Sequence, residues 1–267
     1  MKTPQIAVVL LGLCALLPAC DEHKYDAVLV EAAAPPAARS APTPTPPVTA
    51  PAAPTWTKKS AADCKPHPAT IDFTDQPGLE KEVRRKLSKD TGPITPSDLA
   101  QVKSVNLSSA KLHQIDPCIF PMLTSLKGCF LGAGDYDDLA PLQKLATLED
   151  LNVSSSQVKD LHAIEGLKKL DRLDLSHTRV GDEQLKSVGS LVNLTELTLD
   201  EDPITDLAPI ANLTKLTLLS IKRTNVGSLA PLSGIKTLRK LYIAGTNVSD
   251  ITPVKGATAS GLKIFNN

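Results

Sequence analysis

Leucine-rich segments recur at a nearly constant interval from residue 102 onward, and this repetition constrains the fold more than any other feature. Each copy follows the pattern L-x-x-L-x-L-x-x-(T/N)-x-(V/I)-x-D, with related residues in some slots. Copies start 22 or 24 residues apart, at Val102, Leu126, Leu148, Leu170, Leu194, Leu216 and Leu238. Leu262 and Ile264 start an eighth, incomplete copy. Repetition at this period is typical of a solenoid, in which each unit stacks on its neighbours.

The spacing within a copy predicts a short strand followed by a turn. Leucines two residues apart, such as Leu173 and Leu175, point to the same face of a strand and can meet their counterparts in neighbouring copies. The Thr or Asn slot follows where the chain turns, and its side chain can satisfy backbone groups inside the coil. No copy buries its apolar residues alone, so stability depends on stacking and on covered ends.

The repeat resembles that of bacterial internalin-type leucine-rich-repeat proteins over about residues 70–267. This resemblance implies an α/β solenoid, a leucine-rich-repeat horseshoe with a parallel concave sheet, short convex helices or 3-10 turns, and a helical N-terminal cap. Residues 102–267 would hold the repeats, seven plus a partial eighth. Residues 182–188 of one longer copy predict a fuller helical turn.

The N-terminal cap is expected over residues 61–101. Leu79, Val83 and Leu87 recur every four residues, which places them in one apolar stripe of a helix that can cover the open end of the core. Thr95 stands before a proline and is a suitable start for a second short helix. The C-terminal end shows no comparable cap.

Residues 1–19 are typical of a signal peptide. Lys2 supplies the positive charge, and the apolar run 6–17 is too short to span a bilayer. The Leu-Pro-Ala-Cys sequence that follows resembles a bacterial lipobox, which makes Cys20 the predicted lipidation site. Ordinary cleavage near Ala19, with Cys20 left free, is the alternative.

Residues 20–60 join this predicted lipid anchor to the folded part. Their Pro/Ala-rich composition cannot bury a core, and it predicts a disordered, extended linker. A lipidated cysteine followed by such a tether predicts a lipoprotein of the bacterial cell envelope that faces the periplasm or the exterior. The choice between the inner and the outer membrane stays open.

Three further cysteines lie in the predicted folded part. Cys129 occupies an inward strand slot held by leucine in other copies, so we expect a small buried hydrophobe there. Cys64 and Cys118 both lie outside the strand core of a chain exported to an oxidising compartment. A Cys64–Cys118 disulfide is our preferred pairing, and Cys118–Cys129 is its rival.

The recurring acidic residues are better explained by structure than by catalysis. Aspartates recur at the repeat period just before each predicted convex turn, where an Asp or Ser can accept backbone N–H bonds. These positions are Asp138, Asp160, Asp182, Asp206 and Asp250, with Ser228 in the same slot. The sequence has no C-x-x-C zinc pattern, phosphate-binding loop, dinucleotide fingerprint or G-x-S-x-G motif. We therefore predict no catalytic residue, metal site or cofactor.

The residues that flank the inward strand positions point to the concave face, where leucine-rich repeats commonly bind. These candidates are Phe130, Asp150, Asn152, Arg172, Asp174, Glu196, Thr198, Asp200, Leu218, Lys222, Lys240, Tyr242 and Lys263. They are acidic in the middle copies and basic in the last three, which favours a partner of complementary polarity. We predict Phe130, Leu218 and Tyr242 as anchors. A merely solvated face with scattered charges is the alternative.

Charge and composition narrow the function classes. Lys plus Arg and Asp plus Glu number 29 each, so no overall field favours nucleic acid. The repeats leave no room for an enzyme domain. We expect a non-catalytic module that binds an unidentified protein, contacts the membrane through its N-terminal lipid, and takes no small-molecule substrate. The alternative is a structural or adhesive envelope component that binds peptidoglycan or polysaccharide.

Overall fold

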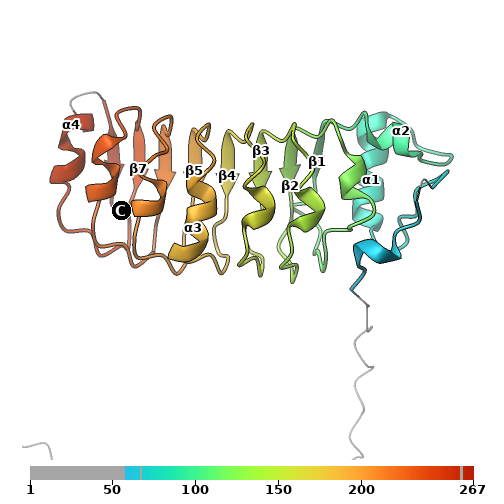
Figure 1. Ribbon diagram of the computed structural model, residues 1–267, viewed down its shortest axis with the longest axis horizontal. Coiled ribbons are helices and arrows are strands. Elements are labelled where there is room, and N and C mark those ends of the chain that lie inside the picture. Colours follow the sequence, from blue (N-terminus) through green and yellow to red (C-terminus); the bar gives the residue numbers. More distant parts are fainter. Residues whose placement is uncertain (1–57, 67, 259–260) are drawn as a thin grey trace, which may run out of the picture. The chain divides into compact units, whose positions relative to one another are not determined.

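The computed structural model describes residues 58–66, 68–258 and 261–267. Within these ranges eight three-residue strands form one sheet, in sequence order and all parallel (Figure 1). The strands are β1 (Ser104–Asn106), β2 (Gly128–Phe130), β3 (Asp150–Asn152), β4 (Arg172–Asp174), β5 (Glu196–Thr198), β6 (Leu218–Ser220), β7 (Lys240–Tyr242) and β8 (Lys263–Phe265). Each strand begins one coil of the solenoid, and we number the coils 1 to 8 after their strands.

The inward leucines form one continuous row, as the repeat predicts. Leu151 pairs with Leu173, Leu173 with Leu197, and Leu197 with Leu219 in the register of the sheet. Each of these four side chains is no more than 2% exposed. The coils therefore share a single apolar core, and the predicted solenoid is confirmed.

Short helices lie on the side of the coils opposite the strands (Figure 1). Most are 3-10 turns: η2 (Phe120–Met122), η3 (Ala140–Leu142), η4 (His162–Ile164), η5 (Ala208–Ile210), η6 (Ala230–Gly234) and η7 (Thr252–Val254). Coil 4 instead carries α3 (Asp182–Gly189), the fuller helical turn that its longer repeat predicts, and α4 (Lys255–Thr258) follows η7. We call this side the helix face.

The recurring aspartates have the structural role that their period predicts, at four of five positions. Asp138, Asp160, Asp206 and Asp250 each accept the backbone N–H of the residue two positions later, at 2.7–2.9 Å. Ser228 accepts the equivalent bond at 3.2 Å. These bonds satisfy N–H groups at the start of the 3-10 turns, which the helical hydrogen bonds leave unpaired.

Asp182 departs from this rule. Helix α3 begins at Asp182 itself and Gly181 precedes it, so the carboxylate lies inside the first turn rather than ahead of it. It accepts bonds from the backbone N–H of Thr205 at 2.8 Å and of Asp206 at 3.1 Å, both in the next coil. The predicted cap at Asp182 is wrong because the longer helix moves this residue out of the capping position.

The Thr slot of the repeat closes the turn after each of several strands. Thr224 Oγ1 donates to the carbonyl of Ile221 at 2.8 Å, and Thr246 Oγ1 donates to that of Ile243 at 2.7 Å. These hydroxyls satisfy carbonyl groups inside the coil, as predicted. In coil 5 the slot holds Asp202, which is 2% exposed.

The N-terminal cap consists of two helices ahead of β1. Helix α1 (Pro77–Leu87) buries Leu79 and Val83, whereas Leu87 is only partly buried against the core. Helix α2 (Pro96–Leu99) begins after Thr95, whose hydroxyl accepts the backbone N–H of Asp98 at 3.3 Å. Both helices confirm the predicted cap.

The preferred disulfide is confirmed. Cys64, just after η1 (Ala61–Asp63), bonds to Cys118 in coil 1, with the two Cα atoms 5.2 Å apart. The rival Cys118–Cys129 pairing is excluded, since Cys129 is free and fully buried. Burial raises the pKa of the Cys129 thiol to about 12, so the group stays in its unreactive protonated form at neutral pH.

The predicted signal peptide, Cys20 and residues 20–57 of the linker lie outside the described residues. Within the described ranges, no helix has the length and apolar character needed to cross a bilayer.

Candidate functional site

The sheet face carries the predicted binding residues in columns that cross the strands. Asp150, Arg172, Glu196, Leu218 and Lys240 are successive partners in the parallel register. A second column on the same face runs through Asn152, Asp174, Thr198, Ser220, Tyr242 and Phe265. Asp200 and Lys222, which follow β5 and β6, lie beside it. The strand register thus brings residues 22 to 24 positions apart into direct contact.

The acidic half of the face, over β3 to β5, is held by contacts between coils. The Arg172 guanidinium donates two hydrogen bonds to the Asp150 carboxylate, from Nε to Oδ1 and from Nη2 to Oδ2, the second at 2.9 Å. The hydrogen bonds and the charge of Asp150 raise the pKa of Arg172. Asp174 accepts bonds from the Asn152 amide at 2.9 Å and from the Ser176 backbone N–H at 3.0 Å. These side chains are therefore held in fixed positions before any partner binds.

The basic half, over β6 to β8, contains an aromatic pair. Tyr242 stacks on Phe265 with ring centroids 4.5 Å apart and planes 13° apart. The Lys222 ammonium lies 6.0 Å from the Tyr242 centroid and 2.9 Å from Asp200 Oδ2. Aromatic rings stacked this way offer a flat apolar contact within a charged rim, which is the composition of an interface core.

The three predicted anchors do not form one patch. Phe130 is 38% exposed on β2, and its ring lies over Gly128, where an added Cβ would come within 3.1 Å of it. Four strands separate Phe130 from Tyr242. Leu218 is half-buried between them. The described sheet face therefore has one aromatic pair, Tyr242 and Phe265, near one end. It has no large, continuous aromatic patch.

Phe265 is a sheet-face residue that the sequence analysis missed. The spacing could have identified it, because Phe265 follows Lys263 by two residues just as Tyr242 follows Lys240. The incomplete eighth copy hides this equivalence, whereas the pairing of Tyr242 with Phe265 in the sheet displays it.

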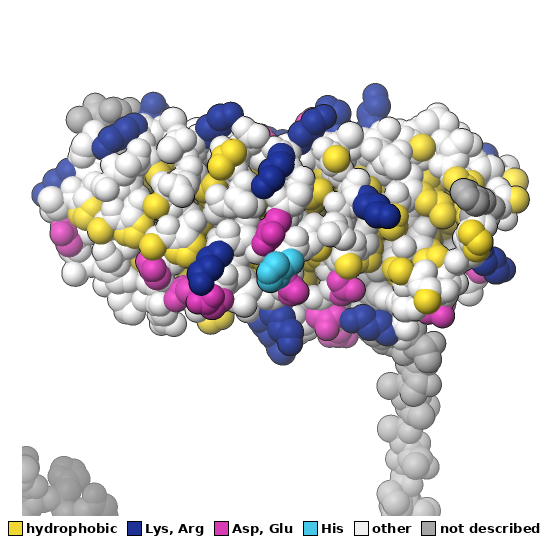
Figure 2. Space-filling model, in the orientation of Figure 1, with side chains coloured by type: hydrophobic (Ala, Val, Ile, Leu, Met, Phe, Trp, Pro, Cys, Tyr) yellow, Lys and Arg dark blue, Asp and Glu magenta, His cyan; other side chains and the backbone are white. Residues whose placement is uncertain are grey.

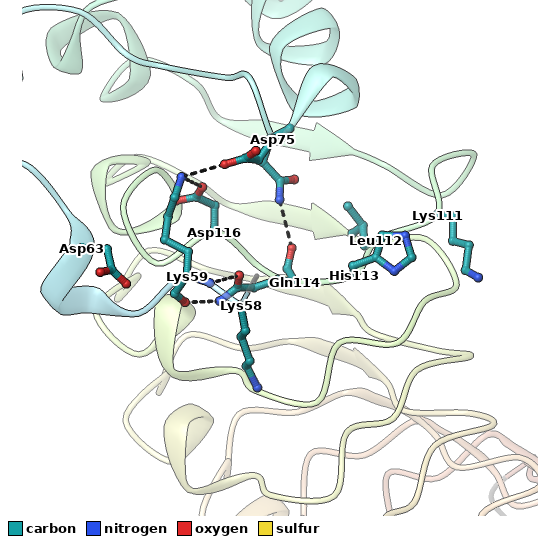
Figure 3. A pocket seen from close by; sticks show the side chains of 10 residues that line it. Lys58, Lys59, Asp63, Asp75, Lys111, Leu112, His113, Gln114 and Asp116 are labelled. Atoms are coloured by element: carbon teal, nitrogen blue, oxygen red, sulfur yellow. Dashed lines mark hydrogen bonds and ion pairs between the residues drawn. The ribbon is translucent and has the colours of Figure 1, made fainter. Parts of the chain in front are cut away.

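Within the described ranges, no group of three or more His, Cys, Asp or Glu side chains is arranged to hold a metal ion. A hollow of about 650 Å³ lies beside the N-terminal cap rather than on the sheet face (Figure 3). Its lining comes from residues 58–63, the start of the cap and residues 111–116 of coil 1.

Figure 3 shows that the polar groups of this hollow bond to one another. Lys59 exchanges two bonds with Gln114, donating its backbone N–H to Oε1 at 2.8 Å and accepting from the amide nitrogen. The Lys59 ammonium lies 3.2 Å from Asp116 and 3.3 Å from Asp75. Together with the adjacent disulfide, these contacts fasten residues 58–64 to coil 1. The hollow therefore lies where the N-terminal segment is joined to coil 1, and its polar groups have a structural role.

Comparison with known proteins supports the fold. No protein-family model matches the sequence, and no curated protein sequence matches it either. Among solved structures, internalin C2 of Listeria monocytogenes is similar, with a TM-score of 0.63 and 25% identity, over 72% of this chain and 93% of that one. An internalin F of the same organism has a TM-score of 0.58 and 22% identity, over 71% of this chain and 62% of that one. The described part of the chain therefore has the leucine-rich-repeat solenoid fold seen in internalins.

Proposed function

We propose that this chain is a non-catalytic recognition module that binds another protein through its sheet face. The observation that carries the proposal is the continuous sheet face itself, on which eight coils present side chains already fixed by contacts between coils. Pre-ordered side chains lose little conformational entropy when a partner binds. The likeness to internalin structures supports a protein-binding role.

The binding site proposed within this face is its basic half. Lys240 and Lys263 are adjacent in the register and exposed, and they flank the Tyr242–Phe265 stack. An acidic segment of a partner with an apolar side chain at its centre would complement this arrangement. The acidic residues over β3 to β5 would orient the same partner through its basic groups.

Substitution of the face tests this proposal. The full chain, captured with its partner from envelope extracts, is compared with the Tyr242→Ala and Asp174→Ala variants. Loss of an aromatic anchor weakens binding by about 2 kcal/mol or more, so Tyr242→Ala should bind more than tenfold more weakly. Glu183→Ala and Lys186→Ala on α3 are matched controls, because this exposed ion pair lies on the helix face. Unchanged affinity in both sheet-face variants would show that the face is wrongly assigned.

The proposal further includes display at the bacterial cell envelope, with lipidated Cys20 as anchor and residues 20–60 as tether. Two or more acyl chains give durable anchoring, since each buried methylene contributes about 0.8 kcal/mol. Cells fed a labelled fatty acid should incorporate it into the wild-type chain and not into a Cys20→Ser variant, which should leave the membrane fraction. Labelling of the Cys20→Ser chain would refute the anchor.

One observation favours the second candidate, a structural or adhesive envelope component. Phe130 on β2 and the half-buried Tyr242–Phe265 stack on β7 and β8 lie near opposite ends of the described sheet with four strands between them, so the face offers no compact central anchor. Capture experiments separate the candidates. A recognition module should retain one dominant protein in stoichiometric amount, whereas an adhesive component should bind peptidoglycan or polysaccharide diffusely and retain no dominant protein.

A further inference from the structure

The balanced charge of the chain hides a difference in net charge between the two edges of the solenoid. Basic residues are in excess in the loops that lead into the strands, and acidic residues are in excess in the loops that leave them, which also carry Lys111, Lys159 and Arg179. Figure 2 shows this excess on the helix face: the upper margin carries mainly Lys and Arg, whereas most Asp and Glu lie in the lower half together with some Lys and Arg. We call the loops that lead into β3 to β7 the basic edge. Its exposed cations are Lys144, Lys168, Lys169, Lys215, Lys236 and Arg239.

Contacts between coils position two of these cations, Lys168 and Lys215. The Lys168 ammonium donates to the carbonyl of Ser190 in the next coil at 3.0 Å, and the Asn193 amide donates back to the carbonyl of Lys168 at 2.7 Å. The Lys215 ammonium then donates to the Asn193 side-chain oxygen at 2.7 Å. Neighbouring strands lie about 4.8 Å apart, and the loop that leads into β5 contributes Asn193 in place of a cation, so Lys168 and Lys215 are two coils, or roughly 10 Å, apart.

The row is not neutralised by the acidic residues of the same loops. Glu149 forms an ion pair with Lys127 at 2.7 Å. Asp171 accepts a hydrogen bond from the Thr195 hydroxyl at 2.7 Å, and Glu165 accepts one from the Ser187 hydroxyl of α3. The six cations of the basic edge donate to carbonyl or amide oxygens or point to solvent, and none takes part in an ion pair among the described residues. Their charges are available to a ligand.

The opposite, acidic edge is where the N-terminal segment is fastened. Lys58 lies 2.7 Å from Asp137, and Lys59 lies 3.2 Å from Asp116. Figure 1 shows η1 at the lower margin of the coils. The described segment nearest the predicted tether is therefore bound at the edge away from the cations, which leaves the basic edge uncovered by it.

We propose that the basic edge binds a linear anionic glycopolymer, one whose carboxylate or phosphate groups repeat along its length. Cations in four of the five loops, aligned along one edge of the solenoid, match a linear chain of repeated anions better than they match a compact ligand. This inference uses residues outside the sheet face, so it goes beyond the proposed protein-binding function.

Two other classes of polyanion fit the edge less well. Insertion into a membrane surface requires an apolar face, and Val192, at 50% exposed, is the only large exposed hydrophobic residue in the described loops of this edge. Binding of single-stranded nucleic acid relies on aromatic side chains that stack on bases, and these described loops contain none.

The test measures binding of the full chain to polygalacturonate and to poly(glycerol phosphate). The edge variant combines Lys168→Gln, Lys169→Gln, Lys215→Gln and Lys236→Gln. Its control removes the same number of exposed charges elsewhere, with Lys111→Gln, Lys159→Gln, Arg179→Gln and Lys186→Gln. Circular dichroism and thermal unfolding verify that both variants fold.

We expect the wild-type chain to bind at least one polymer, with an affinity that falls as salt rises. The edge variant should bind about tenfold or more weakly, because phosphate and carboxylate contacts add with the number of cations. The control variant should stay within about twofold of the wild type. Tyr242→Ala should leave polymer binding unchanged, which separates this inference from the proposed sheet-face function.

Three results would overturn the inference. The first is no binding of either polymer at physiological ionic strength. The second is an equal loss in the control variant, which would mean that total charge and not the basic edge is responsible. The third is binding to phosphatidylglycerol vesicles or single-stranded DNA at least as tight as to the polymers, with the same dependence on the four lysines.

Discussion

At the scale of single residues, Asp202 is the position where the repeat pattern and the chemistry disagree. It occupies the slot that Thr224 and Thr246 hold in later coils, but it brings a carboxyl group into the core. Its Oδ1 accepts two bonds from Thr178, from the backbone N–H and from the hydroxyl, each at 2.8 Å. Its Oδ2 is buried without a hydrogen-bond partner. Burial raises the pKa of Asp202 to about 7, although the bonds from Thr178 oppose the shift.

This raised pKa predicts that stability falls as pH rises. In the unfolded chain an Asp ionises near a pKa of about 3.9, whereas in the native state Asp202 keeps its proton to about pH 7. Between these values the native state binds more protons, so the free energy of unfolding decreases with increasing pH. Asp202→Asn, which cannot ionise, should flatten this dependence and stabilise the protein by about 1 kcal/mol or more at pH 8.

Urea unfolding at pH 5 and pH 8 measures the effect of this substitution. Asp90→Asn, at an exposed position, is the control and should follow the wild type. Parallel stabilities of wild type and Asp202→Asn at the two pH values would contradict the account. The position of Asp202 in the repeat was predictable from the sequence. Its pKa was not, because it depends on burial and on an oxygen without a hydrogen-bond partner, and the spacing of residues predicts neither.

At the scale of elements, the repeat predicted the strands, their register and the turns, because each depends on where apolar side chains point. It did not predict the backbone at the turn after each strand. Ser155, His177, Glu201, Arg223 and Gly245 occupy the same slot in five successive coils, and all have φ between 54° and 73°. Four of the five carry a side chain that disfavours this left-handed region, so nothing in their identities signals the conformation.

The backbones of coils 1 and 2 come close together at a glycine. Gly134 of coil 2 pairs with Leu112 of coil 1, and a Cβ added at Gly134 would lie 1.8 Å from the Leu112 carbonyl oxygen. We predict that Gly134→Ala destabilises the protein by about 3 kcal/mol or more, since the backbone of coil 1 would have to move. Gly227→Ala is the matched control, because no atom lies within 4 Å of its added Cβ.

Chemical denaturation compares the two alanine variants. Gly227→Ala should stay within about 1 kcal/mol of the wild type. Equal stabilities of the two variants would show that Gly134 and Leu112 are not in close backbone contact.

The link between cap and first coil predicts a further loss of stability. The Cys64–Cys118 disulfide closes a segment with a sequence separation of 54 residues. Cys118→Ser, or the Cys64→Ser/Cys118→Ser pair, should destabilise the chain by about 2–5 kcal/mol, because the unfolded chain gains freedom when the loop opens. Thermal unfolding measures the change. A Tm equal to that of the wild type in both variants would mean that the disulfide does not contribute to stability.

At the scale of the whole molecule, the distribution of charge was the feature least accessible to the sequence. Equal numbers of basic and acidic residues gave no overall field that favours nucleic acid, and that prediction considered only the total charge. The stacking of coils sorts these charges, since each slot of the repeat occupies the same edge in every coil. Lys168 and Lys215 thus share one edge with Lys236, whereas Asp138 and Asp206 lie on the other. The sheet face was predictable because its residues alternate with buried leucines.

Hydroxyl-radical footprinting of the full chain, free and bound to its captured protein partner, tests the central claim that the sheet face is the recognition surface. Tyr242 and Phe265 should react less in the complex, because the partner covers their stacked rings. His162, exposed at the start of η4 on the helix face, should react equally in both states. Protection of His162 together with unchanged reactivity of Tyr242 and Phe265 would contradict the account.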